Sequence, residues 1–360
     1  MRSIRSIRSK SFLIFVLVLS IFCINTAAWS ANNVKYMLKM ASVGPDGVRW
    51  ATYCKNEIQN TIKKATNGEV GFSWYWGCIM GDEEDSIAKM RIDQLQGGLL
   101  SLAGTGMICP ELAIMTLPFM FNNYDEVNYM KKKMGARFKE IAAEKGYKVL
   151  MLIHQDFDQI YSKYPMNTSE HYLKCKFVTY TGKNEAEVIK NLGSSPIPIN
   201  VPEIASAVRS GIINTCISPA MWWLGSQLYT VSKYVNTTKI RYSPGTIVVT
   251  MKAWNRIPKM HQKAMIKELP ALEDGFCKEA ITGNEKALRA MINYGIKEVI
   301  LTPEETDSLK KKTRPVWNAL ADDMYPKTLL DEFTSMLDKY RNSKIKSKTQ
   351  KTIKTLSLNK

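Results

Sequence analysis

The pattern of apolar positions predicts helix–strand units that end in glycine. Met90, Ile92 and Leu95 stand at helical spacing before a Gly-Gly stop. A short apolar strand over residues 99–103 follows, and Gly104 indicates a bare turn at its carboxyl end. Since ligands of open α/β sheets bind outside the carboxyl ends of the strands, Gly104 is a candidate binding residue.

A second unit of the same kind lies about a hundred residues further on. Residues 202–211 form a short helix with a glycine stop, residues 212–217 a strand, and residues 218–223 the segment that follows it. Two such units predict an α/β protein whose two lobes face one cleft.

The other elements fit two lobes of ordinary domain size. Strands are predicted over 34–42, 70–75, 147–153 (with 159–163 as a continuation), 176–181, 246–252 and 298–301, and helices over 50–66, 82–96, 271–294 and from Thr302 onward. Thr302 is followed by Pro303 and Glu305, which is typical of a capped helix start.

The first thirty residues read as a signal peptide. Four basic residues precede an apolar stretch over 12–24, which is shorter than a membrane span requires, and Ala28-Trp29-Ser30 is a suitable cleavage site. An uncleaved anchor is the alternative. The sequence therefore predicts export, most simply to the periplasm.

The net charge of +17 is concentrated at the two ends of the chain. Residues 1–30 carry four basic residues, residues 344–360 carry six lysines, and neither segment has an acid, which leaves +7 for residues 31–343. A mildly basic body is no footprint for nucleic acid, and we predict no nucleic-acid partner. The lysine-rich tail over 342–360 is predicted to be disordered.

Catalytic and metal-binding patterns are missing from the sequence. Only three histidines occur, without metal-ligand spacing, and neither a nucleophile-elbow nor a phosphate-loop motif appears. The acidic run over 82–85 fits a helix start better than a cation site. Seven cysteines, six after cleavage, show no C-x-x-C spacing, so buried thiols and disulfides both stay open. We predict no catalytic residue, metal or cofactor.

Five motifs together resemble the substrate-binding proteins of tripartite ATP-independent periplasmic (TRAP) transporters, the dicarboxylate-receptor branch of solute-binding proteins. The resemblance covers roughly residues 34–341. It rests on Gly81-Asp82-Glu83 leading to Gly97, Leu117-Pro118-Phe119-Met120-Phe121, Pro165-Met166-Asn167-Thr168, Pro202-Glu203-Ile204 leading to Gly211-Ile212-Ile213-Asn214, and Lys252-Ala253-Trp254.

The resemblance implies a two-lobed periplasmic binding protein fold, type II-like, with hinge strands and a long connecting helix. The lobes would close on one ligand and deliver it to the membrane permease subunits. The corresponding division is a signal peptide over 1–30, lobe I over 31–157, lobe II over 158–240, a shared return segment over 241–341 and the tail.

The sequence departs from this family where an arginine usually clamps a ligand carboxylate. Aligned from Pro165, that place is Val178 or Thr179, and a further family arginine would fall near Asp158. Between Phe157 and Lys239 the only arginine is Arg209, on a predicted solvated helix face. A guanidinium suits carboxylate binding through two parallel hydrogen bonds, so its absence argues against a simple carboxylate ligand.

Aromatic and small polar residues stand at the predicted strand ends instead. We expect a neutral or amphipathic ligand among aromatic side chains, oriented by a few polar groups, with at most one of Trp222 and Trp223 touching it. The predicted binding residues are Trp76, Gly104, Phe119, Gln155, Tyr161, Thr179, Tyr180, Ser218, Trp222 and Trp223. The alternatives to a transport receptor are a periplasmic sensor for a membrane signalling protein and an enzyme on a similar bilobal fold.

Overall fold

The computed structural model describes the backbone of residues 34–358, and the predicted signal peptide lies outside the described residues. One mixed sheet, ordered β2-β1-β3-β8-β4-β7-β5-β6 with β9 paired to β8, runs through the molecule. The strands are β1 (Tyr36–Ala41), β2 (Val70–Tyr75), β3 (Gly97–Leu100), β4 (Tyr147–Ser162), β5 (Lys176–Thr179), β6 (Ser195–Pro198), β7 (Thr215–Ser218), β8 (Tyr234–Thr250) and β9 (Lys297–Val299).

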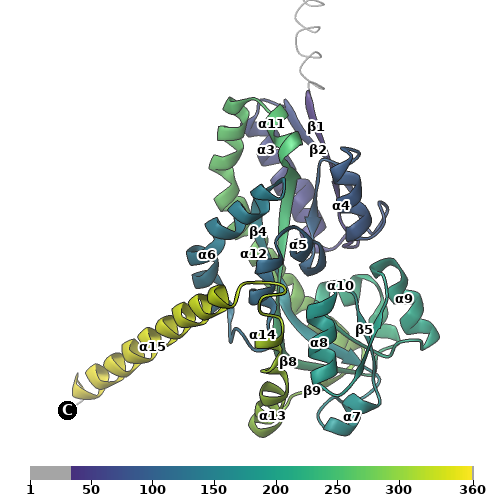
Figure 1. Cartoon of the computed structure of the whole chain (residues 1–360), viewed down its shortest axis with the longest axis vertical. Coiled ribbons are helices and arrows are strands. Elements are labelled where there is room, and N and C mark those ends of the chain that lie inside the picture. Colours follow the sequence, from purple (N-terminus) through teal and green to yellow (C-terminus); the bar gives the residue numbers. More distant parts are fainter. Residues whose placement is uncertain (1–33, 359–360) are drawn as a thin grey trace, which may run out of the picture.

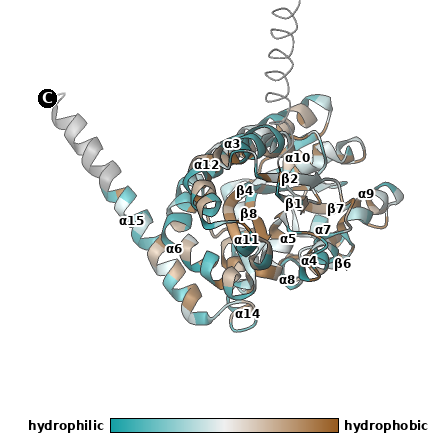
Figure 2. Ribbon diagram, turned by 90° about the horizontal axis from the view of Figure 1, so that it is seen from above, coloured by the Kyte–Doolittle hydropathy of each residue, from teal (hydrophilic) through white to brown (hydrophobic). Residues whose placement is uncertain are grey.

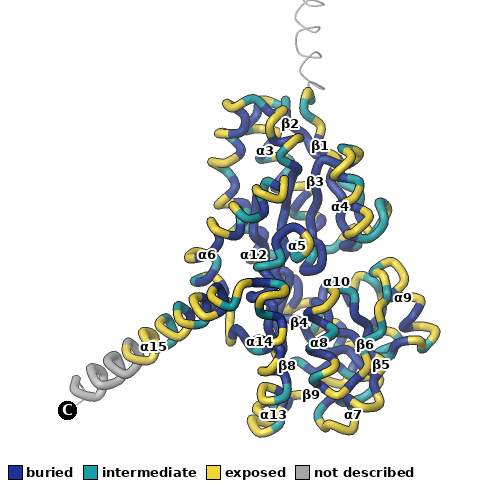
Figure 3. Tube along the Cα trace, in the orientation of Figure 1, coloured by how far each residue is buried: buried dark blue, intermediate teal, exposed yellow. Residues whose placement is uncertain are grey.

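Two long antiparallel strands, β4 and β8, hold the two lobes together (Figure 1). Near one end β8 pairs with β3 of lobe I, and near the other end β4 pairs with β7 of lobe II. Both strands are buried along almost their whole length (Figure 3). The register between them shifts at three places, one of them between His154 and Asp156, where an irregularity bends the ladder.

Helices cover both faces of the sheet in each lobe (Figures 1 and 2). They are α2 (Arg49–Tyr53), η1 (Cys54–Ile58), α3 (Gln59–Ala65), α4 (Glu83–Arg91), α5 (Leu102–Ile108), η2 (Pro110–Thr116), α6 (Tyr124–Glu144), α7 (Ser169–Leu173), α8 (Lys183–Asn191), α9 (Val201–Ser210), α10 (Ala220–Gly225), η3 (Leu228–Thr230), α11 (Met251–Arg256), α12 (Lys259–Tyr294), α13 (Pro303–Thr313), α14 (Val316–Ala319) and α15 (Lys327–Leu358). In the part of the chain that the structure describes, no helix is both long and apolar enough to cross a membrane.

The long helix α12 links the lobes on one side of the sheet. It contacts α2 and α3 of lobe I, β4, and α10 of lobe II. It begins twelve residues before the predicted position 271, because Pro270 is accommodated inside the helix and does not end it. Together with β4 and β8, this helix confirms the predicted hinge strands and connecting helix. The predicted lobe boundaries, at 157/158 and 240/241, fall inside β4 and β8.

Two local predictions were wrong. Strand β3 begins at Gly97, where a side chain would collide with the backbone of β8, so these glycines permit close strand pairing and do not end a helix. Residues 102 and 103 are already helical, and Gly104 lies inside α5 and not in a bare turn. Helix α15 extends into the predicted tail as far as residue 358.

Candidate functional site

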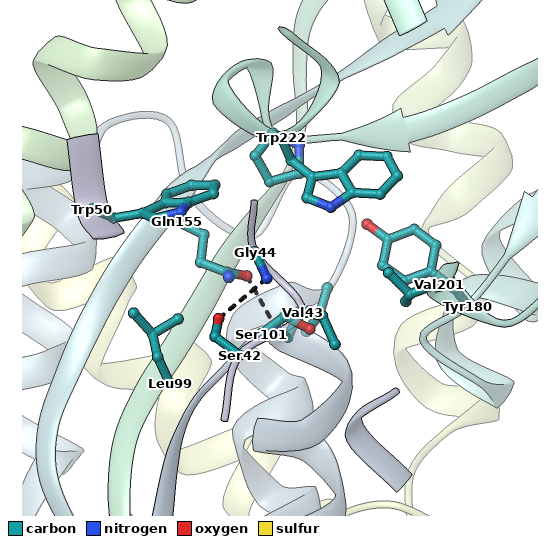
Figure 4. A pocket seen from close by; sticks show the side chains of 12 residues that line it. Ser42, Val43, Gly44, Trp50, Leu99, Ser101, Gln155, Tyr180, Val201 and Trp222 are labelled. Atoms are coloured by element: carbon teal, nitrogen blue, oxygen red, sulfur yellow. Dashed lines mark hydrogen bonds between the residues drawn. The ribbon is translucent and has the colours of Figure 1, made fainter. Parts of the chain in front are cut away.

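A cavity lies between the two lobes, where the carboxyl ends of strands from both lobes converge (Figure 4). Lobe I contributes the segment after β1, the helix α2, strand β3 and the start of α5. Lobe II contributes the residue after β5 and the first turns of α9 and α10, and β4 supplies Gln155. The lining residues are Ser42, Val43, Gly44, Trp50, Leu99, Ser101, Leu102, Gln155, Tyr180, Val201, Pro219 and Trp222.

Aromatic and aliphatic groups dominate the cavity wall. Trp50 comes from lobe I, whereas Tyr180 and Trp222 come from lobe II, so rings approach the same space from both sides (Figure 4). None of the described residues that line the cavity is charged. The predominantly apolar lining with a few polar groups is typical of a site for a small organic molecule.

The polar groups of the wall are fixed by the protein's own hydrogen bonds. The Ser42 hydroxyl accepts from the backbone N–H of Gly44 (3.1 Å), and Oε1 of Gln155 accepts from the N–H of Leu102 (3.1 Å). The Tyr180 hydroxyl donates to the Ile217 carbonyl (3.2 Å). By contrast, the indole Nε1 of Trp50 is buried without a partner.

Two buried carboxylates occupy the helix starts that border the cavity. Glu83 accepts from the backbone N–H of Ser101 and of Gly104 (2.6 Å) at the start of α5, and from the Ser101 hydroxyl (2.5 Å). Asp156 accepts from the N–H of Ala220 (3.2 Å) at the start of α10. Burial raises the pKa of Glu83, and it raises the pKa of Asp156 to about 8.

The guanidinium of Arg241, on β8, is fully engaged behind the cavity wall. Its Nε donates to Asp158 (2.7 Å), its Nη1 to Glu185 (2.7 Å) and its Nη2 to the Ile217 carbonyl (3.3 Å). Although burial opposes the charge, the carboxylates of Glu185 and Asp158 raise the pKa of Arg241, which therefore stays protonated. It is 5% exposed and does not line the cavity.

The structure brings three of the ten predicted binding residues, Gln155, Tyr180 and Trp222, to the cavity. Trp222 lines the cavity and Trp223 does not. Ser218 and Thr179 precede lining residues but point elsewhere, since their hydroxyls donate to the carbonyls of Pro219 (3.3 Å) and Gly182 (3.3 Å).

The other five predicted residues lie outside the cavity. Trp76 is 5% exposed and stacks on Trp74, at 4.9 Å between ring centroids. Tyr161 and Trp223 stack on each other in the core, at 4.7 Å. Gly104 receives the Glu83 carboxylate, and Phe119 packs against the core in a left-handed backbone conformation. These side chains complete the lobes and do not form the cavity wall.

Sequence reasoning missed the lobe I half of the wall. Ser42, Gly44 and Trp50 lie at and after the exit turn of β1, at the carboxyl end of a strand. The rule that selected Gly104 applies equally there and would have found them.

The predicted helix start over 82–85 is confirmed, because Asp82 and Asp85 form a reciprocal capping box. Among the described residues, no cluster of three His, Cys, Asp or Glu side chains is arranged to hold a metal ion.

Comparison with known proteins decides the family. The model of the bacterial extracellular solute-binding proteins, family 7, matches residues 40–323. The chain belongs to this family, whose characterised relatives and structural neighbours are TRAP periplasmic binding proteins. These family members are solute-binding proteins and not enzymes.

Three similar proteins illustrate the range of ligands. The C4-dicarboxylate-binding periplasmic protein of Rhodobacter capsulatus is 21% identical over 279 residues, 76% of this chain and 83% of that protein. The ectoine-binding periplasmic protein of Halomonas elongata is 24% identical over 199 residues, 52% of this chain and 53% of that protein. The sugar acid binding protein of Advenella mimigardefordensis in complex with galactonate has a TM-score of 0.80 at 17% identity, covering 86% of this chain and 99% of that chain. The last likeness confirms the two-lobed fold.

Proposed function

We propose that this protein is the periplasmic receptor of a TRAP-type secondary transporter, which captures a small neutral or amphipathic organic ligand between its lobes. It delivers this ligand to the membrane permease subunits. Membership of the family and the periplasmic location of the relatives support this role and the predicted export. The cavity between the lobes is the capture site.

The composition of the cavity wall carries the proposal on ligand class. Three aromatic residues, Trp50, Tyr180 and Trp222, supply large apolar surfaces, and the hydroxyls and amide at the wall supply orientation. No lysine or arginine is among the described residues that line the cavity. An anionic ligand would therefore lose its hydration without gaining a cationic partner, which is unfavourable. The proposed ligand class therefore differs from the C4-dicarboxylates and galactonate that two relatives bind.

Closure follows from the placement of the aromatic residues. Trp50 moves with lobe I, and Tyr180 and Trp222 move with lobe II. A ligand that contacts both groups binds the closed form more tightly than the open form, and it shifts the population by that difference in affinity. The bends in β4 and β8 and the link through α12 provide the hinge.

Two measurements on the purified native protein test the proposal. Mass spectrometry of the small molecules released on denaturation should identify a neutral or amphipathic compound, and adding it to stripped protein should reduce the radius of gyration in X-ray scattering. Micromolar binding of succinate in preference to apolar compounds would overturn the ligand class. Identical scattering with and without the released compound would overturn the closure mechanism.

A further inference from the structure

We propose that Asp158 and Glu185 determine ligand specificity by filling the carboxylate-binding site of Arg241 with the protein's own carboxylates. The inference rests on the proposed function and deepens it, because it assigns the exclusion of carboxylate ligands to two named residues. Arg241 is then an anion site that is satisfied from within the chain.

The position of Arg241 directly behind the cavity wall supports this assignment. Tyr180 lines the cavity, and its hydroxyl donates to the same Ile217 carbonyl as Nη2 of Arg241. Glu185, which holds Nη1, also accepts from the backbone N–H of Tyr180 (2.9 Å). One wall residue and its hydrogen bonds therefore separate the guanidinium from the ligand space.

The hydrogen bonds of the guanidinium explain why a ligand cannot compete. Nε and Nη1 each donate to a carboxylate oxygen at 2.7 Å, and both carboxylates are 0% exposed at the side chain. Two negative groups face one positive group, and Oδ1 of Asp158 is buried without a partner. A third carboxylate at this site would meet net negative charge, so the pair both occupies the site and repels an anion.

Internal carboxyl groups also accept hydrogen bonds at two short helices that border the cavity. Glu83 accepts from the backbone N–H of Gly104 in α5, and Asp156 accepts from the backbone N–H of Ala220 in α10. The starts of α2 and α9, which also border the cavity, have no side-chain cap. Asp158 and Glu185 are the pair placed on a full positive charge, which makes them the decisive one.

Chemical rescue with formate tests the inference. Asp158→Ala removes one carboxylate and leaves a space of that size beside Nε of Arg241 and the Ser243 hydroxyl, which also donates to Asp158 (2.5 Å). We expect 100 mM sodium formate to raise the thermal midpoint of Asp158→Ala relative to 100 mM sodium chloride. For a dissociation constant of roughly 10 mM, the folding equilibrium constant rises about 11-fold.

The matched control is Asp158→Asn, which removes the charge but keeps the volume and so leaves no space for formate. The wild type and Asp158→Asn should show no formate-specific shift. If Asp158→Ala does not fold during purification, its refolding yield in formate can be compared with its refolding yield in chloride. The thermal midpoint of Asp158→Ser in formate and in chloride gives the same comparison on a second variant.

The absence of a formate-specific effect in both the alanine and the serine variants would overturn the inference, as would an equal effect in the wild type. Neither result affects a neutral ligand recovered from the native protein, so the proposed function would stand. Conversely, the wild type and Arg241→Lys could bind succinate with the same affinity. That result would refute the proposed ligand class and would show that succinate binds at a site other than Arg241. The formate comparison would still decide whether internal carboxylates fill the site of Arg241.

Discussion

Trp222 and Trp223 are neighbours in the chain, yet we predict that replacing each by alanine has opposite consequences. Trp223 is 1% exposed, stacks on Tyr161 at 12° between the ring planes, and donates from Nε1 to the Ser232 hydroxyl (3.1 Å). Trp222 is half-buried and lines the cavity. The first residue should support stability and the second should support binding.

The burial of Trp223 sets the expected loss of stability. A buried tryptophan removes about 150–250 Å² from water, and at about 25 cal/mol per Å² this is worth roughly 4–6 kcal/mol as an upper estimate. Since measured Trp→Ala losses in cores are about 3–5 kcal/mol, we expect Trp223→Ala to lower the free energy of unfolding by that amount. The urea midpoint would fall by roughly 1 M or more.

For Trp222→Ala we expect a stability loss of about 1 kcal/mol or less, because the half-buried ring leaves no closed cavity behind. Loss of one ring at the ligand should weaken binding by about 2 kcal/mol, roughly 30-fold. Urea unfolding gives the stability of both variants, and mass spectrometry of the compound retained per protein gives the binding. The reasoning is refuted if Trp222→Ala is destabilised as much as Trp223→Ala, or if it retains the compound at the wild-type level.

Three further predictions concern packing, pH and thiols. Gly97→Ala should lower the free energy of unfolding by about 1–3 kcal/mol, because its methyl group would overlap the backbone of β8. The control is Gly106→Ala in α5, whose methyl group meets nothing within 4 Å and which should be neutral or stabilising by about 0.5–1 kcal/mol. Equal urea midpoints of the two variants would contradict the strand packing. Burial opposes the charge of Glu126, but the paired Arg341 (2.8 Å) lowers the pKa of this carboxyl group, so the pair stabilises the fold above about pH 4 and its contribution fades as pH falls through the lowered pKa. Arg341→Ala should therefore unfold at a lower urea concentration than the wild type at pH 7, and the difference between their midpoints should narrow below pH 4. A difference that does not change with pH would argue against the ion pair. All six cysteines of the described residues are free and five are buried, and burial raises the pKa of the sixth, Cys78, to about 11. Ellman's reagent at pH 8 should therefore react slowly with the native protein and rapidly after unfolding. Fast reaction of the native protein would contradict this burial.

The hydrophobic pattern predicted correctly those elements whose apolar residues repeat at a regular spacing and whose ends carry a local stop signal. Strand β2 over 70–75 and helix α9 before Gly211 agree with it closely, because alternation, helical spacing and a glycine stop each act locally. Strands β4 and β8 are much longer than predicted. Their polar stretches around Asp158 and Arg241 are buried as an ion pair, and periodicity counts such residues as exposed.

The site was harder to predict than the fold, since alternation shows which residues share a face but not which face is the core. Trp74 and Trp76 do stack on one side of β2, but that side packs inside lobe I. The sequence also showed that Arg209 is the only arginine between Phe157 and Lys239. It gave no sign that Arg241 returns to the same region from β8, because Asp158 and Arg241 are 83 positions apart in the sequence.

The passage of β8 through the middle of the sheet has a consequence for how the chain is made. The inner edge of β3 has no neighbour until residues 246–249 exist, and the surface of β4 that α12 covers stays bare until about residue 294. A ribosome must therefore produce most of the polypeptide before either half can finish folding. Throughout that interval the edge of β3 stays unpaired and the apolar surface of β4 stays exposed, and both features favour aggregation of an incomplete chain.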